Sequence, residues 1–272
     1  MILVTGANGR LASGVIRLLR GRGADVVGAS RTPAGGMRRL DFDEPDSLDF
    51  RGADTVVLVS AGRGEDDVVV ARHRAAVDAA VRDGVSQLVY TSVTTAGEHL
   101  VHAVSHRATE RLVRESGLDW TILRNGMYAE AFAMLLGRGA DGVLESPYAD
   151  GVLAAVARAD LAEAAAVVAH DPAVHAGRVY DLVGPPMSTA DVAGAAGAGW
   201  RTIGLGEFRA RLERQTRLLP VQREMALSIA SNVRHGFLAA QGPQLERLIG
   251  RPPTDPVPVA AHALGRAGAQ GR

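Results

Sequence analysis

The chain has 272 residues and carries 30 acidic and 30 basic side chains, so its formal net charge at pH 7 is zero. This balance gives no electrostatic reason to expect a nucleic acid or an anionic membrane as a partner, and the length suits one large domain or one domain with a lobe. The sequence contains neither cysteine nor lysine, which excludes disulfides, thiol catalysis, thiolate metal sites and any mechanism that requires a lysine.

Residues 2–4 are apolar β-formers and read as a strand that runs directly into a Gly-x-x-Gly-x-x-Ala turn. A core strand this close to the N-terminus leaves no room for a signal peptide, and no apolar run in the chain reaches the ~20 residues of a membrane span. We therefore expect a cytoplasmic protein without a membrane partner.

The turn has the arrangement that a dinucleotide pyrophosphate requires. Gly6 allows a tight turn, Gly9 lets the backbone approach the phosphates, and the small Ala12 lets the next helix pack closely on the strand. The N-terminus of that helix directs free N–H groups toward the anion. A glycine turn that binds nothing is the alternative, but its place between the first strand and the first helix favours a cofactor site. The predicted contacts in this turn are Gly6, Asn8, Gly9, Arg10 and Leu11.

Strand-like apolar runs then alternate with helical patterns. This alternation predicts a doubly wound, parallel α/β sheet of the Rossmann type with right-handed crossovers. The predicted strands cover residues 2–4, 24–29, 38–42, 55–59, 87–91, 120–123 and 179–183, and the predicted helices cover residues 13–20, 66–82, 105–116 and 158–170.

The rhythm changes after Leu123. Residues 125–138 read as helical, residues 139–148 as a loop, and residues 188–249 mostly as helices, with an amphipathic helix at 208–218. The Ala/Gly/Arg-rich tail after about Ala260 is expected to fray. We expect residues 1–124, with a return strand near 179–184, to form an NAD(P)-binding Rossmann domain. Residues 125–272 are expected to form a small, mainly helical substrate lobe interleaved with the sheet.

The end of the second strand indicates which cofactor is bound. An NAD-selective site places Asp or Glu about 20 residues after the glycine turn, where this chain has Ser30 and Arg31. A charge-assisted bond from Arg31 to a 2′-phosphate is worth ~1.5–3 kcal/mol, which is enough for a preference for NADP(H), with NAD(H) as a possible cofactor. The alternative is a solvated loop arginine.

Other strand ends should lie beside the cofactor, because ligands bind at the carboxyl ends of parallel strands. Asp41 and Phe42 are placed to contact the adenine, although Asp41 is equally suited to capping the next turn. Ser92 is placed to contact substrate, although a plain strand-end hydroxyl is the simpler interpretation. The further predicted cofactor contacts at strand ends are Ser60, Ala61, Gly62, Thr91 and Ser92.

Several motifs together resemble the atypical short-chain dehydrogenases of the NmrA-like group, in particular the branch of NAD(P)H:quinone oxidoreductase type 2 and triphenylmethane reductase. The resemblance covers nearly the whole chain and implies a Rossmann-type domain with a small C-terminal lobe that reduces quinone-like acceptors. The motifs are Thr5–Ala12, Arg31, Tyr90–Ser92, His106–Glu110, Leu123–Tyr128, Ala159–Asp160, Val179–Gly184 and Leu248–Pro252.

The resemblance also assigns a role to His106. The Tyr-x-x-x-Lys pair of short-chain dehydrogenases cannot exist in a chain without lysine, and His106 occupies the position of the active-site lysine in isoflavone reductase-like proteins. An imidazole there can donate to the nicotinamide ribose or help to protonate the product. His99, His102 and His106 have a spacing that would align three imidazoles on a helix, but no carboxylate completes the set, and we expect no metal.

Asn125 and Tyr128 follow the sixth predicted strand and should face the nicotinamide. Asn125 is suited to holding a carbonyl oxygen, and Tyr128 to covering the ring or supplying a proton; Tyr128 as a packing aromatic is the alternative. We interpret Glu110 and Asp160 as structural polar groups and not as catalysts.

These residues predict an NADPH-dependent reductase that transfers a hydride to a quinone or similar conjugated small molecule. A quinone is already electrophilic, so strong general-acid catalysis is less necessary, and the proton source is open between water, Tyr128 and His106. The alternatives are a non-catalytic NADP(H)-binding redox sensor that regulates a partner, and a pathway-specific ketone or imine reductase. The sequence leaves the oligomeric state open, a homo-oligomer included.

Overall fold

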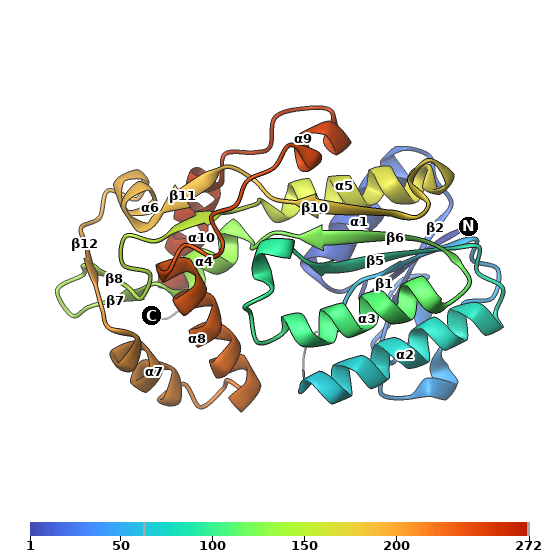
Figure 1. The fold of residues 1–272 in the computed structure, drawn as a ribbon, viewed down its shortest axis with the longest axis horizontal. Coiled ribbons are helices and arrows are strands. Elements are labelled where there is room, and N and C mark those ends of the chain that lie inside the picture. The colour runs from blue at the N-terminus through green and yellow to red at the C-terminus, as the bar shows by residue number, and fades with distance from the viewer. Residues whose placement is uncertain (62–63, 271–272) are drawn as a thin grey trace.

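Seven parallel strands form the central sheet of the computed structural model, which describes residues 1–61 and 64–270, the last four of them in backbone only. The strands lie in the order β10-β6-β5-β4-β1-β2-β3 (Figure 1). The strand order therefore reverses between β1 and β4, which is where such sheets bind their ligands. This confirms the predicted doubly wound α/β sheet. The strands are β1 (Ile2–Thr5), β2 (Val26–Ser30), β3 (Arg38–Arg39), β4 (Thr55–Leu58), β5 (Gln87–Val93), β6 (Asp119–Asn125) and β10 (Arg178–Leu182).

Helices cover both faces of this sheet. α1 and α5 lie together on one face, and α2 and α3 on the other (Figure 1). Every residue of β4 and β5 is buried, as strands covered on both faces require. Gly14 permits the close approach of α1 to α5, because a Cβ there would lie 3.0 Å from the Cβ of Ala162. The helices are α1 (Arg10–Gly21), α2 (Asp66–Arg82), α3 (Ala103–Glu115) and α5 (Arg158–His170).

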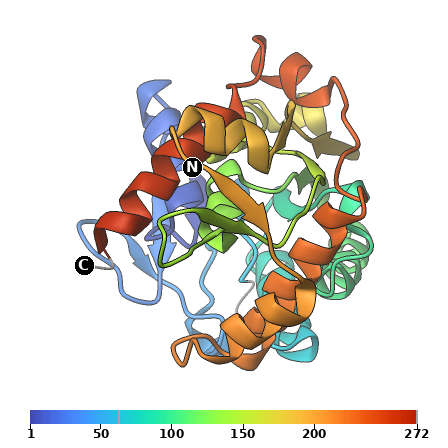
Figure 2. The same ribbon diagram turned by 90° about the vertical axis from the view of Figure 1, so that its left-hand side faces the viewer.

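A mainly helical lobe follows at one end of the sheet, and Figure 2 views the molecule from that end. It has its own core, in which the rings of Phe132 and Tyr148 stack with their centroids 4.2 Å apart. Its helices are α4 (Ala129–Leu135), α6 (Thr189–Ala195), α7 (Leu205–Glu213), α8 (Pro220–Arg234) and α10 (Pro256–Gln270). Its short strands are β7 (Gly137–Arg138), β8 (Leu144–Ser146), β9 (Val152–Ala154), β11 (Pro186–Ser188) and β12 (Trp200–Thr202).

The remaining elements are short. α9 (Gln244–Ile249) packs against α5 and β10, and single 3-10 turns occur at Pro45–Ser47, Thr95–Gly97 and Pro172–His175. No helix in the described part of the chain is long and apolar enough to cross a membrane.

Two expectations for the middle of the chain were wrong. The helix predicted over 125–138 is only α4, because β6 extends through Asn125 and Gly126 continues along β10, where its N–H donates to the carbonyl of Leu182 at 2.8 Å. The loop predicted over 139–148 contains β8, which pairs with β7 and with β12. Three-residue strands are too short to give a sequence period, so their pairing partners decide that they form.

The C-terminal expectations also need correction. The tail after Ala260 does not fray at that point, because α10 runs from Pro256 to Gln270 and packs on α4, with Ala260 fully buried. Alanine is the best helix former, and the apolar face of α4 gives this helix a surface to cover. The helix predicted over 208–218 is α7, which begins earlier, at Leu205, and ends at Glu213.

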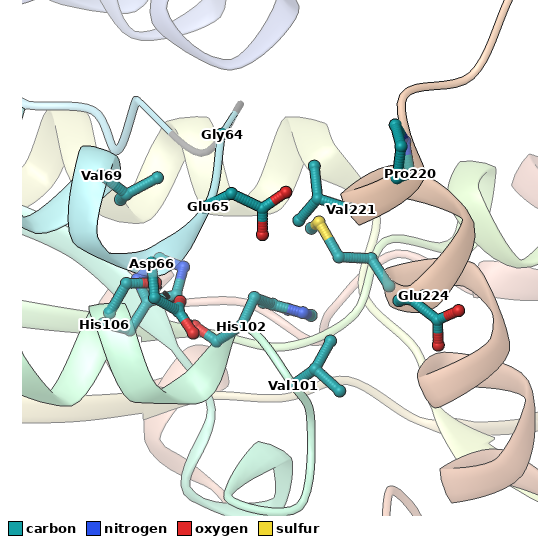
Figure 3. Close-up of a pocket in the computed structure, with 12 residues that line it drawn as sticks. Gly64, Glu65, Asp66, Val69, Val101, His102, His106, Pro220, Val221 and Glu224 are labelled. Atoms are coloured by element: carbon teal, nitrogen blue, oxygen red, sulfur yellow. Dashed lines mark hydrogen bonds between the residues drawn. The ribbon is translucent and has the colours of Figure 1, made fainter.

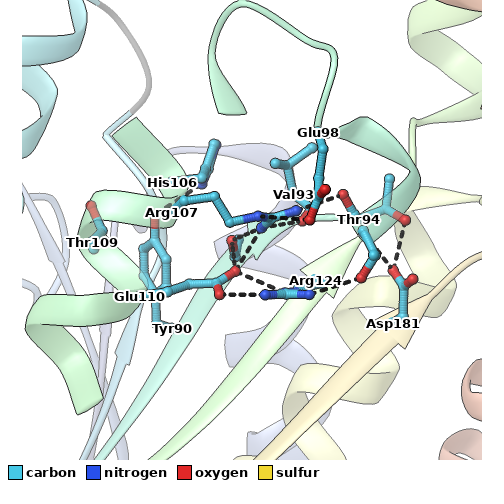
Figure 4. Close-up of polar contacts among 12 residues, drawn as sticks. Tyr90, Val93, Thr94, Glu98, His106, Arg107, Thr109, Glu110, Arg124 and Asp181 are labelled. Atoms are coloured by element: carbon cyan, nitrogen blue, oxygen red, sulfur yellow. Dashed lines mark hydrogen bonds and ion pairs between the residues drawn. The ribbon is translucent and has the colours of Figure 1, made fainter. Parts of the chain in front are cut away.

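A buried carboxylate, Glu110 on α3, connects the carboxyl ends of the central strands (Figure 4). Its Oε1 accepts from Ser92 of β5 at 2.7 Å and from Arg107 of α3 at 2.7 Å, and Arg124 of β6 donates to both of its oxygens at 2.9 and 2.7 Å. Arg107 also donates to the carbonyl of Val93 at 3.0 Å. One carboxylate thus holds α3, β5 and β6 in register at the edge where the site lies.

The electrostatics of this cluster favour ionised Glu110. Burial alone would raise its pKa, but the hydrogen bonds from Arg124 and Ser92 and the charges of Arg107 and Arg124 outweigh burial and lower the pKa of Glu110. Its stabilising contribution is therefore complete above the ordinary glutamate pKa of about 4.3 and is lost as the pH falls below it.

We expect Glu110→Ala to lower the free energy of unfolding by ~3–5 kcal/mol, because it removes the buried carboxylate to which two largely buried guanidinium groups, of Arg107 and Arg124, donate directly. Urea unfolding at pH 7 measures this loss. The matched control is Glu98→Ala, whose exposed carboxylate lies 3.9 Å from Arg107 and should contribute less than about 1 kcal/mol. Equal losses for the two variants would contradict the role given to Glu110.

Candidate functional site

The glycine turn after β1 has the geometry of a phosphate cradle. Gly6 has φ +66°, in the left-handed region that glycine adopts without strain, and the N–H of Gly9 donates to the carbonyl of Gly6 at 2.7 Å. A Cβ on Gly9 would lie 3.0 Å from that carbonyl oxygen, so only glycine fits comfortably. α1 begins directly afterwards at Arg10, and its first backbone N–H groups lack intrahelical partners. The turn and helix therefore fit a pyrophosphate.

A cavity of about 700 Å³ lies beside this turn, at the carboxyl ends of β1, β2 and β4. It is at the switch point of the sheet, where a dinucleotide cofactor is expected. Its described lining residues are Gly6, Asn8, Gly9, Ser30, Arg31, Thr32, Leu40, Asp41, Phe42, Asp43, Val59, Ser60, Ala61 and Arg72. The set includes most of the cofactor contacts expected from the sequence.

The other expected cofactor contacts lie elsewhere. Arg10 is exposed on the first turn of α1, and Leu11 is buried in the core between α1 and α5. Thr91 is buried behind the cavity wall, where its Oγ1 accepts from the N–H of Ser60 at 3.0 Å, and the hydroxyl of Ser92 donates to the carboxylate described above. Gly62 lies outside the described residues.

Asn8 fastens the glycine turn to the end of β2. Its Nδ2 donates to the hydroxyl of Ser30 at 2.8 Å and to the carbonyl of Thr32 at 3.0 Å. Arg31, between these two residues, is exposed and lines the cavity. The Asn8 bonds therefore fix the backbone that carries Arg31.

Asp41 lines the cavity and also caps the turn that follows it. Its Oδ1 accepts from the N–H of Asp43 at 3.1 Å, and its own N–H donates to the hydroxyl of Ser47 at 2.9 Å. Both interpretations of Asp41 considered from the sequence are therefore compatible with its position. Phe42 lies beside it in the cavity wall.

Sequence reasoning missed the ion pair between Arg72 and Asp43. Nε and one terminal nitrogen of Arg72 donate to the two carboxylate oxygens of Asp43 at 2.6 and 3.0 Å, and both residues line the cavity. Arg72 lies in the second turn of α2, far from Asp43 in sequence. The available signal was an arginine near the start of a helix that begins at the carboxyl edge of the sheet.

A second cavity, of about 360 Å³, lies between the start of α2, the start of α3 and α8 of the lobe (Figure 3). Its described lining residues are Gly64, Glu65, Asp66, Val69, Val101, His102, Ser105, His106, Pro220, Val221, Glu224 and Met225. The two cavities adjoin along α2, because Arg72 lines the first and Val69, one helical turn earlier, lines the second. A molecule in the second cavity would therefore lie next to the far end of the first.

His106 and His102 give the second cavity its polar chemistry. Nδ1 of His106 lies 2.9 Å from the hydroxyl of Tyr90, and His102 Nδ1 is buried without a hydrogen-bond partner among the described residues. Burial, followed by the charges of neighbouring histidines and Arg107, lowers the pKa of His106 to about 3, and burial lowers that of His102 to about 4. Both rings are therefore neutral at pH 7. No group of three His, Asp or Glu side chains in the described ranges is arranged to hold a metal ion.

Asn125 and Tyr128 line neither cavity. Asn125 is buried, and its Oδ1 has no hydrogen-bond partner among the described residues. The ring of Tyr128 lies under the guanidinium group of Arg158, 4.7 Å from its centroid, and burial raises the pKa of its hydroxyl. His106 therefore lies with Tyr90 and His102, and Tyr128 packs instead against the α1 and α5 side of the sheet.

Known proteins with similar sequences are NAD(P)H-binding proteins and reductases. The model of a family described as NAD(P)H-binding matches residues 6–172. Quinone oxidoreductase 2 of Escherichia coli (strain K12) is 33% identical over 199 residues, which are 68% of each chain. A (4-alkanoyl-5-oxo-2,5-dihydrofuran-3-yl)methyl phosphate reductase of Streptomyces griseus is 31% identical over 280 residues, 93% of this chain and 94% of the relative.

A solved structure extends the likeness to three dimensions. The NADPH complex of the NADPH-dependent quinone oxidoreductase QOR2 from Escherichia coli has a TM-score of 0.84 to this chain at 29% identity, covering 96% of this chain and 99% of the other. The glycine turn, the cavity at the switch point and these relatives agree on the same chemistry. An NmrA-like family domain-containing oxidoreductase of Aspergillus flavus is 29% identical over 179 residues, 59% of this chain and 58% of the relative. The chain belongs to the family described as NAD(P)H-binding, it is related to quinone oxidoreductase 2, and it is an NAD(P)H-dependent oxidoreductase.

Proposed function

We propose that this enzyme uses NADPH to reduce a quinone or a similar flat, conjugated acceptor. The observation that carries the proposal is the pair of adjoining cavities, both bordered by α2. The first is suited to a dinucleotide, and the second is a partly apolar chamber with two neutral histidines. The name of the Escherichia coli relative, quinone oxidoreductase 2, supports the same acceptor class.

In this proposal the residues of the larger cavity hold the cofactor. The turn from Gly6 to Gly9 binds the pyrophosphate and Arg31 faces the 2′-phosphate. Asp41 and Phe42 lie beside the adenine. The bound nicotinamide supplies the hydride. Arg72 offsets the charge of Asp43 by pairing with it, which reduces the repulsion between that carboxylate and the phosphate beside Arg31.

His106 is the proposed catalytic residue of the smaller cavity. Its Nδ1 is engaged by Tyr90, which leaves Nε2 for the acceptor. A neutral imidazole with a proton on Nε2 can donate to the oxygen that becomes negative when a hydride adds to the quinone ring. Asn125 and Tyr128, which the sequence placed at the nicotinamide, line neither cavity, and this proposal gives them no contact with the acceptor.

The proposal predicts oxidation of NADPH, followed at 340 nm, with simple benzo- and naphthoquinones. His106→Ala should lower kcat by ~10²-fold, with little change in the Kd of NADPH, because it removes the hydrogen-bond donor and no cofactor contact. Since the pKa of His106 is about 3, its protonation should not reduce the rate between about pH 5 and pH 8. The exposed His99, replaced by alanine, is the matched control.

The outcomes separate the candidate functions. Turnover of quinones that falls in the His106 variant supports the reductase. Tight NADPH binding without turnover of any quinone in the panel contradicts it and favours the redox-sensor interpretation, and turnover of ketones or imines alone favours a different reductase.

Arg31→Ala should raise the Kd of NADPH about 10–150-fold and leave the Kd of NADH unchanged, because only NADPH carries the 2′-phosphate. Isothermal titration calorimetry measures both. Arg39→Ala is the control, because Arg39 pairs with Glu44 at 2.8 Å and does not line the cavity. If both cofactors weakened equally, Arg31 would not be the phosphate contact.

Gly9→Val should abolish binding of NADPH and NADH alike, because its side chain collides with the carbonyl of Gly6 and occupies the place of the pyrophosphate. Gly21→Ala at the other end of α1 meets open space and should bind both cofactors normally. Circular dichroism establishes that each variant is folded. A folded Gly9→Val protein with normal affinity would mean that the cofactor binds elsewhere.

A further inference from the structure

His73 on α2 is a fully buried histidine to which the proposed reaction gives no role. It lies between the two cavities but lines neither of them. Its ring stands edge-on to Tyr90, with the centroids 5.6 Å apart, and both of its nitrogens are hydrogen-bonded within the protein. A buried imidazole with two directed hydrogen bonds fixes the positions of the groups that it contacts, here Ala61 and Thr109.

The protonation of His73 follows from its partners. The backbone N–H of Ala61 can only donate, and it points to Nε2 at 2.9 Å, so Nε2 must be the unprotonated nitrogen. Nδ1 therefore carries the proton and donates to Oγ1 of Thr109 at 2.8 Å. The hydroxyl of Thr109 in turn donates to the carbonyl of Ser105 at 2.8 Å. The direction of each of these three hydrogen bonds is thereby fixed.

The two ends of this series of hydrogen bonds, Ala61 and Ser105, are at different cavities. Ala61 lines the cofactor cavity, and Ser105 lines the second cavity one residue before the proposed catalytic histidine. Next to Ala61, the N–H of Ser60 is held by Oγ1 of Thr91 at 3.0 Å. Two buried side chains thus hold consecutive amides of the segment after β4, which we call the rim (residues 60–61).

We propose that His73 is a positioning residue that holds the rim in the shape that receives the cofactor and ties it to α3 beside the acceptor cavity. Neutrality suits this role, because a proton on Nε2 would set two donors against each other at Ala61. Burial, with a smaller effect of the charge of Arg72, lowers the pKa of His73 to about 4, so the accepting form is present at neutral pH. The inference rests on the assignment of NADPH to the larger cavity.

The test compares two substitutions that each keep one half of the imidazole. The amide of glutamine reaches the position of Nε2, so His73→Gln retains an acceptor for Ala61. The shorter asparagine reaches only the position of Nδ1, so His73→Asn retains the contact with Thr109 and loses the hydrogen bond from Ala61 in the rim. We expect His73→Asn to raise the Kd and KM of NADPH about tenfold, the ratio that ~1.4 kcal/mol produces. We expect the Kd and KM of NADPH for His73→Gln to stay within about threefold of those of the parent protein.

The control separates positioning from general stability. Gln87→Leu breaks another buried side-chain hydrogen bond, to Thr121 at 3.0 Å, at the amino end of β5 and away from both cavities. It should lower the midpoint of urea unfolding without changing the Kd of NADPH. A merely structural His73 would behave like Gln87, and rescue by glutamine would then be absent.

Three results would be decisive. Weak NADPH binding in His73→Asn with recovery in His73→Gln supports the proposal. Normal NADPH binding in both folded variants overturns it, while loss of binding in Gly9→Val still upholds the cofactor assignment. Equal loss in both variants also overturns it, because the acceptor at Nε2 would then not be the feature that matters.

Discussion

The buried carboxylate of Glu110 is the interaction on which the arrangement of the site depends. It binds α3 to β5 and β6 through Ser92, Arg107 and Arg124, at the edge of the sheet where both cavities open. The bidentate contact to Arg124 uses the planar fork of guanidinium, which fixes direction as well as distance. α3 carries His106 and Ser105 as well as the carboxylate, so the cluster sets where the walls of the acceptor cavity stand.

The two cavities share their walls instead of lying in separate domains. α2 borders both of them, through Arg72 and Val69, and α3 contributes to the second. Among the described lining residues, those from the lobe all belong to α8: Pro220, Val221, Glu224 and Met225. The starts of α2 and α3 therefore supply most of the polar groups of the second cavity, and α8 covers it with three apolar side chains and Glu224.

The sequence predicted what local chemistry determines. The turn from Gly6 to Gly9, the strand ends at Arg31 and Asp41 and the alternation of the first six strands all follow from neighbouring residues. The contacts of His73 with Ala61 and of Arg72 with Asp43 could not be predicted, because each joins segments that meet only after the sheet has formed. α10 was missed for a related reason, since its composition resembles a loose tail until α4 gives it a surface.

The packing of α10 on α4 has a consequence for how the chain is made. Synthesis releases the N-terminus first, so β1 to β6 with α1 to α3 are available to assemble while the lobe is still incomplete. α4 follows β6 directly, yet the last helix of the chain covers it. Until that helix emerges, Phe132 and Ala133 lack part of their cover, and contacts so distant in sequence form slowly. A chain that ends before Pro256 is therefore an aggregation hazard in the cell as well as an incomplete enzyme.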